Sequence, residues 1–240
     1  MDKLFDFNFM IKSIPQLIAY IPVTIWLTVV SMLLGLIVGL FTALVRIYKV
    51  PIFKQLSVIY ISFIRGTPLL VQLFLTYYGI PKFLFFFQNQ YGWFQNVNIN
   101  VIPPEVFAVL AFTSNLGAYL SETIRSAIES VERGQFEAAS SIGMTQTQIM
   151  IKIILPQALL VALPNIGNMM ISTVKDTSLV FTIAITDIMG EAKVIGARAL
   201  AYFEVYVGVS LIYWLICIVL ERILILLENR LKKHERSVVR

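Results

Sequence analysis

Long apolar runs separated by short polar segments dominate the chain. Residues 13–45, for example, contain no Asp, Glu, Lys or Arg. A helix needs about 20 mainly apolar residues to cross the hydrocarbon core of a bilayer. The pattern therefore predicts transmembrane helices at about residues 21–45, 57–80, 106–128, 153–174 and 205–227.

Two stretches do not fit a simple span. The charge-free run 66–81 is too short to cross alone, so the second span must include part of 55–64 and leave Arg65 near the interface, where its side chain reaches the headgroups. Gly66 and Pro68 predict a kink there.

Residues 82–104 are predicted to be a polar loop rich in aromatic side chains. Residues 177–190 are apolar but too short to cross, which indicates a re-entrant or interfacial segment.

The composition agrees with a membrane protein. Of the 240 residues, 58% are hydrophobic and 14% are charged, whereas charged residues approach a quarter of a soluble domain. We therefore expect an all-α integral membrane protein forming a single domain over 1–240, without a removable signal peptide. The net charge of +5 is spread between the spans and does not indicate a nucleic-acid partner. Cys217, the single cysteine, lies in an apolar run and cannot form an internal disulfide.

The distribution of positive charge predicts the orientation. With the first inter-span segment, residues 129–152 and the C-terminal tail on one side, that side holds most of the 19 Lys and Arg residues. Positive charge collects on the cytoplasmic side of membrane proteins. The N-terminus is therefore predicted outside, and residues 129–152 and the C-terminus in the cytoplasm.

The segment around residues 129–152 is longer than a connection between spans needs. Small residues surround Ala138 and Ala139, and Gly143 is a natural break after a short helix. Thr145 followed by Gln148 has the spacing of a capping box, which predicts a second helix. Pro156 is expected to bend or restart that helix as it enters the fourth span. The pattern predicts a helix–break–helix segment suited to docking.

At these residues the chain resembles the cytoplasmic loop of ATP-binding-cassette (ABC) importer permeases. The match covers Glu137, Ala138, Ala139, Gly143, Ile153, Leu155 and Pro156. Residues 63–72, 118–125 and 175–179 are similar to segments of the polar-amino-acid branch of that family. The resemblance implies a type I importer permease fold with five transmembrane helices.

The resemblance also implies partners. The loop 129–152 would couple to separate ATP-binding subunits, which would bind ATP and Mg²⁺, while this chain would bind no cofactor and would not be an enzyme. A periplasmic or extracellular solute-binding protein would deliver the substrate, and a second permease, preferably another copy of this chain, would complete the pathway. The protein would be a multi-pass protein of the bacterial cell membrane, with its basic tail, 222–240, on anionic lipid.

Polar side chains inside spans are costly in hydrocarbon and usually face a cavity or another helix. Such side chains define a candidate substrate pathway, and a methionine beside them adds adaptable apolar surface. The pathway candidates are Gln72, Ser114, Asn115, Asn168, Met169 and Ser172. Hydrogen bonding between helices, without contact to substrate, is the alternative for each polar member. Polar groups near the span ends are candidates for a gate or an inner charged cluster: Arg65, Glu122, Arg125 and Asp176. Glu122 and Arg125 are spaced to pair.

Residues 153–174 contain no acidic residue, whereas a site for lysine or arginine would be expected to present a carboxylate. This favours uncharged polar or zwitterionic amino acids. Within the family, residues 174–198 look most like those of cystine permeases, which suggests L-cystine.

Two other classes of function were weighed. An ion-coupled secondary amino-acid transporter would need carboxylates deep in a span and usually an internal repeat. Neither is evident, since Glu122 lies near the inner end of its span. A membrane-embedded enzyme would need a catalytic constellation, yet the sequence contains no metal-binding spacing, no serine with a plausible histidine partner and no Gly-x-x-x-x-Gly-Lys phosphate loop.

Overall fold

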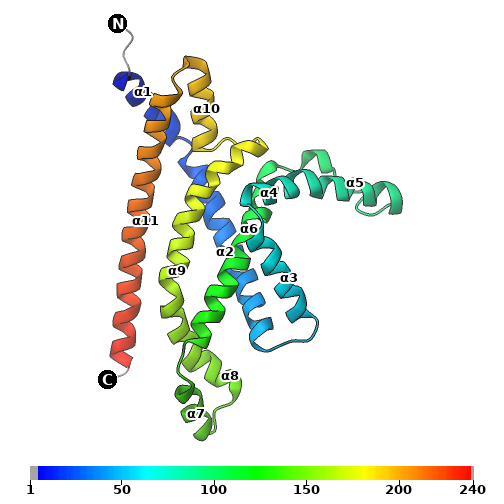
Figure 1. The fold of residues 1–240 in the computed structure, drawn as a ribbon, viewed down its shortest axis with the longest axis vertical. Coiled ribbons are helices and arrows are strands. Elements are labelled where there is room, and N and C mark those ends of the chain that lie inside the picture. The colour runs from blue at the N-terminus through cyan, green and yellow to red at the C-terminus, as the bar shows by residue number, and fades with distance from the viewer. Residues whose placement is uncertain (1–4, 239–240) are drawn as a thin grey trace.

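The computed structural model describes residues 5–238, with side chains from 5 to 230, and that part of the chain contains no β-strand. The long helices run side by side as a bundle (Figure 1); they are α2 (Ile21–Ile47), α6 (Pro104–Glu129), α9 (Leu155–Asp176) and α11 (Tyr202–Val238). Short helices cover the two ends: α1 (Phe7–Ile18) and α10 (Ile188–Ala199) at one, α7 (Arg133–Ser141) and α8 (Gln146–Ile149) at the other.

Helical segments long and apolar enough to cross a membrane occur at Ile21–Ile47, Leu69–Tyr91, Gln146–Ile183 and Tyr202–Arg230. The third predicted span, 106–128, corresponds to α6. It is more polar than these segments because it carries Ser, Thr, Asn and charged residues. It is also the central helix, packed against α2 and α9, and its polar residues Thr113 and Ser121 are buried. The all-helical membrane fold expected from the sequence is confirmed.

Glycines allow α2 and α6 to lie in close contact. A Cβ added to Gly35 or Gly39 would meet the Cβ of Leu116 or Leu120 at 2.7 and 2.8 Å. On α6, a Cβ at Gly117 would meet Val38 at 2.6 Å. Gly-x-x-x-Gly spacing lets helix backbones approach in membranes, where packing rather than water drives association.

The second predicted span, 57–80, has wrong bounds, and the kink predicted at Gly66 and Pro68 is a complete break. The chain forms α3 (Phe53–Gly66), breaks at Thr67, and continues through α4 (Leu69–Phe74), a π-helical turn (Leu75–Gly79) and α5 (Ile80–Tyr91). Pro68 explains the break, since proline pushes the preceding residue out of the helical region and lacks an N–H. Thr67 is extended, with φ −120° and ψ 144°.

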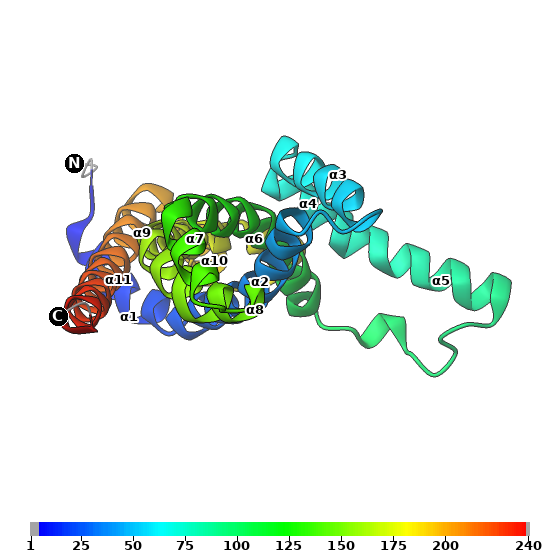
Figure 2. The same ribbon diagram turned by 90° about the horizontal axis from the view of Figure 1, so that it is seen from below.

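The α4–α5 arm leaves the bundle sideways (Figure 2), so residues 82–91, predicted as loop, are helical. The apolar run beyond Lys82 continues the helix to Gly92, whose φ of +66° ends it in the left-handed conformation. A short 3₁₀ helix, Ile99–Val101, precedes α6. The exposed aromatic side chains of this arm include Phe83, Phe86, Tyr91, Trp93 and Phe94.

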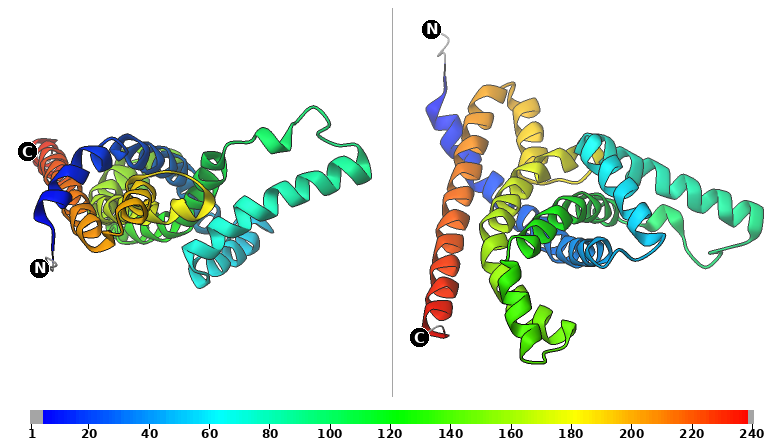
Figure 3. Two further views of the ribbon diagram at one scale, coloured as in Figure 1. Left: turned by 90° about the horizontal axis from the view of Figure 1, so that it is seen from above. Right: turned by 60° about the horizontal axis from the view of Figure 1, so that its bottom comes forward.

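At the end of the bundle seen from above in Figure 3, two helices appear that the sequence analysis did not predict, α1 and α10. They pack on the start of α11 around the buried residues Leu17, Ile188, Ala192, Val205 and Val209. The short segment 177–190 is a 3₁₀ helix (Thr177–Ile183), a turn with Ala184 at φ +65°, and the start of α10.

At the opposite end, the fourth predicted span starts earlier than expected. Helix α8, a π-helical turn (Met150–Ile154) and α9 form one helical run to Asp176. Pro156 follows directly after the wide turn. Because proline removes one hydrogen bond of the α-helical pattern, a local widening lets the helix continue through it.

Candidate functional site

A cavity of about 610 Å³ opens between the break in the second span, α6 and α9. We call it the pathway cavity. Its wall is mostly polar or small: Thr67, Pro68, Leu69, Asn115, Leu116, Tyr119, Thr123, Asn165, Asn168, Met169, Ser172, Thr173 and Asp176. The Thr67–Pro68 break is therefore more than a helix kink, because it forms part of the cavity wall.

Most of the predicted pathway residues share this wall. Asn115, Asn168, Met169 and Ser172 all line the pathway cavity, and so does Asp176, which was expected near a gate. The tertiary structure thus brings residues of the third and fourth spans, more than 50 positions apart, to one surface. This arrangement suits a polar solute.

Gln72 is not among the lining residues. Its side chain is buried, 3% exposed, and its Nε2 donates to the carbonyl oxygens of Ile64 and Thr67 at 2.8 and 3.0 Å. These are carbonyl groups that the helix break frees. Its Oε1 accepts a 3.0 Å hydrogen bond from Asn115 Nδ2. Gln72 therefore holds the break together, as the interhelical alternative allowed.

Ser114 also does not line the cavity. Its backbone carbonyl oxygen accepts a hydrogen bond of 2.5 Å from the hydroxyl of Tyr60. Tyr60 belongs to α3, so this contact ties the helix before the break to α6. The neighbouring Gly117 leaves room for the Tyr60 ring, because a Cβ there would lie 2.8 Å from its hydroxyl.

A carboxylate lies at the pathway cavity just beyond the fourth predicted span. Residues 153–174 contain none, but Asp176, two positions further along, lines the same cavity as Asn168 and Ser172. A carboxylate is therefore available to a cationic group. Its absence from the span cannot serve as evidence against basic amino acids.

Arg65 was expected to extend toward the headgroups. Its guanidinium instead lies over the ring of Tyr119, 5.3 Å from the ring centre. Such a cation–π contact stabilises a guanidinium in a poorly hydrated setting. Tyr119 lines the pathway cavity, whereas Arg65 is exposed and is not one of the lining residues.

An acidic residue of the fifth predicted span also borders a cavity. Glu221 of α11 lines a small cavity of about 140 Å³ together with Pro164, Gly167 and Asn168 of α9. Leu224, one turn further, packs on Gly167, which lies near the middle of α9. Glu221 is exposed and lies level with the middle of α9, although its position at residue 221 suggests the end of the fifth span.

The predicted docking segment has the expected local structure. Helix α7 ends before Gly143, whose φ is +82°, and the capping box of Thr145 and Gln148 starts α8. Of the residues that carry the family resemblance, Ala139 is buried against the end of α6, whereas Glu137 and Ala138 are exposed.

A hollow of about 640 Å³ lies next to this segment, between the end of α6, α7 and the π-helical turn. Exposed Phe136 and the acidic side chains of Glu129, Glu132 and Glu137 line it, with Arg133 the only basic residue among its described lining. The hollow can accept a basic or amphipathic segment of a partner.

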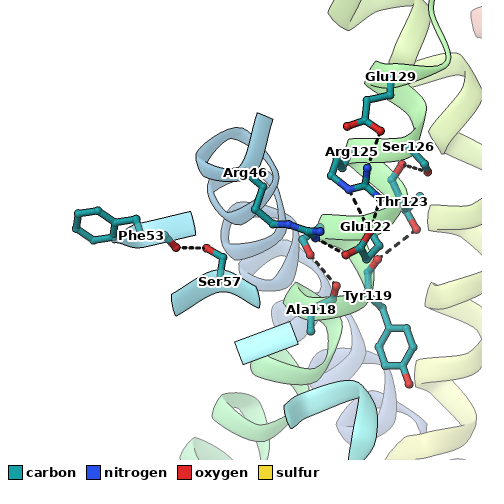
Figure 4. Close-up of polar contacts among 11 residues, drawn as sticks. Arg46, Phe53, Ser57, Ala118, Tyr119, Glu122, Thr123, Arg125, Ser126 and Glu129 are labelled. Carbon is teal, nitrogen blue, oxygen red and sulfur yellow. Dashed lines mark hydrogen bonds and ion pairs between the residues drawn. The ribbon is translucent and has the colours of Figure 1, made fainter. Parts of the chain in front are cut away.

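Charged residues form a cluster near the end of α6 that precedes the predicted docking segment (Figure 4). The predicted pair is present: Arg125 donates to Glu122 at 2.8 and 3.2 Å, and to Glu129 at 2.5 Å. Arg46 of α2 also pairs with Glu122, a contact that the sequence did not reveal. The cluster joins α2 to α6 where the bundle meets α7.

A second polar cluster lies at the opposite end. Asp187 is fully buried, accepts a 2.8 Å hydrogen bond from the backbone N–H of Gly190, and accepts another of 3.2 Å from the Tyr213 hydroxyl. It thereby caps α10 and fixes it to α11. Burial raises the pKa of the Asp187 carboxyl, against the hydrogen bonds that lower it. The Asp187–Gly190 spacing is the sequence signal that could have predicted this cap.

Comparison with known proteins agrees with this architecture. Residues 35–233 match the family described as "Binding-protein-dependent transport system inner membrane component". The L-cystine transport system permease protein TcyL of Bacillus subtilis is 40% identical over 239 residues, covering 100% of this chain and 97% of that protein. TcyB of the same organism, also an L-cystine permease, is 42% identical over 88% of this chain and 84% of its own length. The probable amino-acid ABC transporter permease PatM of Vibrio harveyi is 41% identical over 95% and 97%.

Solved structures show the same fold. A chain from the crystal structure of an amino acid ABC transporter with histidines has a TM-score of 0.82 and 35% identity, covering 95% of this chain and 100% of that one. A chain of the inward-facing MetNI methionine transporter has a TM-score of 0.63 at 19% identity, covering 87% and 94%, which shows the fold alone.

Nothing in these comparisons supports an ion-coupled transporter. The expected all-helical permease fold, the family and the membrane location are confirmed. The chain belongs to the binding-protein-dependent transport system inner membrane components, the multi-pass permeases of bacterial ABC importers.

Proposed function

We propose that this chain is the permease subunit of an ATP-driven importer for polar amino acids, with L-cystine as its foremost substrate. The observation that carries the amino-acid proposal is the pathway cavity, whose wall combines a carboxylate with amide and hydroxyl groups. Such groups can bind the ammonium and carboxylate of an amino acid. The similarity to two L-cystine permeases, at 40% and 42% identity, supports cystine.

Two permease chains, most simply two copies of this one, would form the complete pathway. A separate ATPase would bind the segment 129–152, and a solute-binding protein would deliver substrate at the opposite end. The acidic hollow beside Glu137 supports the ATPase contact, because it fits a basic segment. ATP and Mg²⁺ would be bound by the ATPase.

Uptake by the reconstituted complex tests the substrate. The chain would be produced with a cognate ATPase and solute-binding protein, placed in proteoliposomes containing ATP, and offered labelled cystine, arginine, glutamine and histidine. We expect ATP-dependent uptake with cystine preferred. A preference for arginine would refute cystine while leaving the amino-acid importer in place, and uptake without any ATPase would refute the importer.

The coupling segment has its own test. Glu137→Lys places a positive charge beside a site proposed for a basic partner, so we expect release of the ATPase or loss of substrate-stimulated ATP hydrolysis. Glu105→Lys is the matched control, because Glu105 lies in the first turn of α6, at the other end of that helix. Equal effects of the two substitutions would contradict a coupling role for Glu137.

A further inference from the structure

The surroundings of Gln72 determine which way its amide group points. Its Nε2 faces the carbonyl oxygens of Ile64 and Thr67, which only accept hydrogen bonds. It also contacts Thr67 Oγ1 at 3.0 Å, and that hydroxyl already donates to the carbonyl oxygen of Phe63 at 2.9 Å. All three neighbours therefore require a donor, so the NH₂ group of Gln72 must face them and its oxygen must face the other way.

The orientation of Gln72 fixes the orientation of Asn115. The Gln72 oxygen meets Asn115 at 3.0 Å and can only accept, so Asn115 must turn its own NH₂ group toward it. Asn115 is part of the cavity wall and Gln72 is buried behind it. The remaining polar atom of the Asn115 side chain, Oδ1, has no hydrogen-bond partner within the described residues and is left to the cavity side.

We propose that Gln72 is a positioning residue that makes Asn115 present a carbonyl oxygen to the pathway cavity, where this oxygen accepts a hydrogen bond from the α-ammonium group of the transported amino acid. The inference rests on the proposed function of the cavity. It assigns Gln72 a role in recognition although Gln72 itself does not reach the cavity.

The rest of the wall agrees with an ammonium group. Asp176 supplies a carboxylate, and the described lining contains no Lys or Arg that would repel a cation. Without Gln72, the Asn115 amide could rotate by half a turn and present N–H groups at the same place. An amide that is free to rotate can bind either a hydrogen-bond donor or an acceptor of the ligand. With Gln72 in place, the Asn115 side chain offers an acceptor and therefore favours a donor.

Ligand binding to the complex of permease and ATPase in lipid nanodiscs, without the solute-binding protein, tests the proposal. The probes are the labelled amino acid that the wild-type complex transports and, by competition, its analogue lacking the α-amino groups. Gln72→Met removes the positioning, and Asn115→Leu removes the oxygen while leaving Gln72 on the carbonyls of Ile64 and Thr67. For both variants we expect Kd for the amino acid to rise about tenfold or more, because a hydrogen bond to a charged group is lost.

The deaminated analogue separates recognition from structural damage. If Gln72 and Asn115 only stabilised the structure, their substitution would weaken the binding of both probes. We expect its affinity to stay within about twofold of wild type in both variants, since it has no ammonium group to lose. Gln157→Met is the matched control, because Gln157 also donates from its side chain to a backbone carbonyl, that of Ile153, at 3.1 Å and lies outside the cavity. This variant should bind both probes as wild type does.

Three results would overturn the proposal: equal weakening of both probes, unchanged affinity for the amino acid in either variant, or no saturable binding by a wild-type complex that transports the amino acid. If Gln72→Met does not assemble, Gln72→Leu is used in its place, because Asn115→Leu tests the Asn115 oxygen and not its positioning. Failure of the proposed function would be seen separately, as absence of ATP-dependent uptake by the wild-type complex.

Discussion

Arg46 and Glu122, 76 residues apart in the sequence, form an ion pair between α2 and α6. Glu122 also binds Arg125, so one carboxylate is shared by two guanidinium groups. The side chains are only partly exposed, 19% for Arg46 and 23% for Glu122, which limits screening by solvent. The pair connects the first span to the helix that leads into the docking segment.

Breaking this pair should weaken the contact between the two helices. We expect Glu122→Gln to lower the free energy of unfolding by about 1–2 kcal/mol, because two guanidinium groups lose their partner. A double-mutant cycle with Arg46→Gln, measured by thermal denaturation of the purified complex, should give a coupling energy of about 0.5–1 kcal/mol. Glu129→Gln, at a side chain 54% exposed, should change stability by less than about 0.5 kcal/mol. Additive single substitutions would contradict the pairing.

The glycine contacts between α2 and α6 predict a size limit. Gly39→Leu would drive a side chain into Leu120 and the backbone of Ser121, 2.8 and 3.1 Å from the position of a Cβ. We expect little assembled protein, or a loss of about 1–3 kcal/mol, from overpacking. Gly79→Leu is the control, because nothing lies within 4 Å of a Cβ there. Similar yield and melting temperature for the two variants would be evidence against close packing at Gly39.

Gly143 tests the conformation of the docking segment. Its φ is +82° and the space around it is open, so a side chain there meets backbone strain and no clash. Gly143→Ala should cost about 1 kcal/mol locally. It should also reduce substrate-stimulated ATP hydrolysis more than it reduces yield. Gly143→Asn should retain more activity than Gly143→Ala, since asparagine tolerates this conformation better. The reverse order of activity would show that the left-handed turn is unimportant.

The buried carboxyl of Asp187 predicts a dependence on pH. Burial raises its folded-state pKa above the unfolded value of about 3.9, so the folded protein holds the proton more tightly. Stability contributed by this group is then present below pH about 4 and decreases as the pH rises through the raised pKa. Asp187→Asn keeps a capping side chain and removes this titration.

The melting temperature of Asp187→Asn should therefore increase relative to that of wild type as the pH rises above about 4. Asp187→Ala loses the cap itself and should be less stable than Asp187→Asn by about 1 kcal/mol at each pH. Melting curves of both variants in one buffer series measure the two effects. A constant difference between Asp187→Asn and wild type would show that the carboxyl does not titrate differently on folding.

Local signals were sufficient where a feature depends on a few neighbouring residues. The capping box of Thr145 and Gln148 and the glycine break at residue 143 were predicted from spacing, and the structure contains both. The pairing of Glu122 with Arg125 followed from one helical turn. Asn115 and Asn168 were candidates for a cavity because polar groups are costly in hydrocarbon, and both line one cavity. Hydropathy alone could not show which of the polar groups face it.

Hydropathy failed where apolar composition is compatible with more than one shape. A kink at Gly66 and Pro68 was predicted, but the apolar composition of 57–80 did not show that the helix breaks there and that the arm continues to Tyr91. Helices α1 and α10 were missed, since their apolar sides become recognisable only against the start of α11. The tail 222–240 was predicted to lie on lipid. Its residues up to Val238 belong to α11, and the side chains beyond residue 230 lie outside the described part of the chain.

The sequence by itself determined the membrane class, the helical architecture and the family, because the length of apolar runs and the spacing of a docking motif are properties of neighbouring residues. Only the tertiary structure decided that Arg46 reaches Glu122, that Asp176 shares a cavity with Asn115, and that Gln72 lies behind that cavity. Such relationships depend on how helices pack and where one of them breaks. That packing determines which side chains meet across helices, and it cannot be predicted from patterns among neighbouring residues.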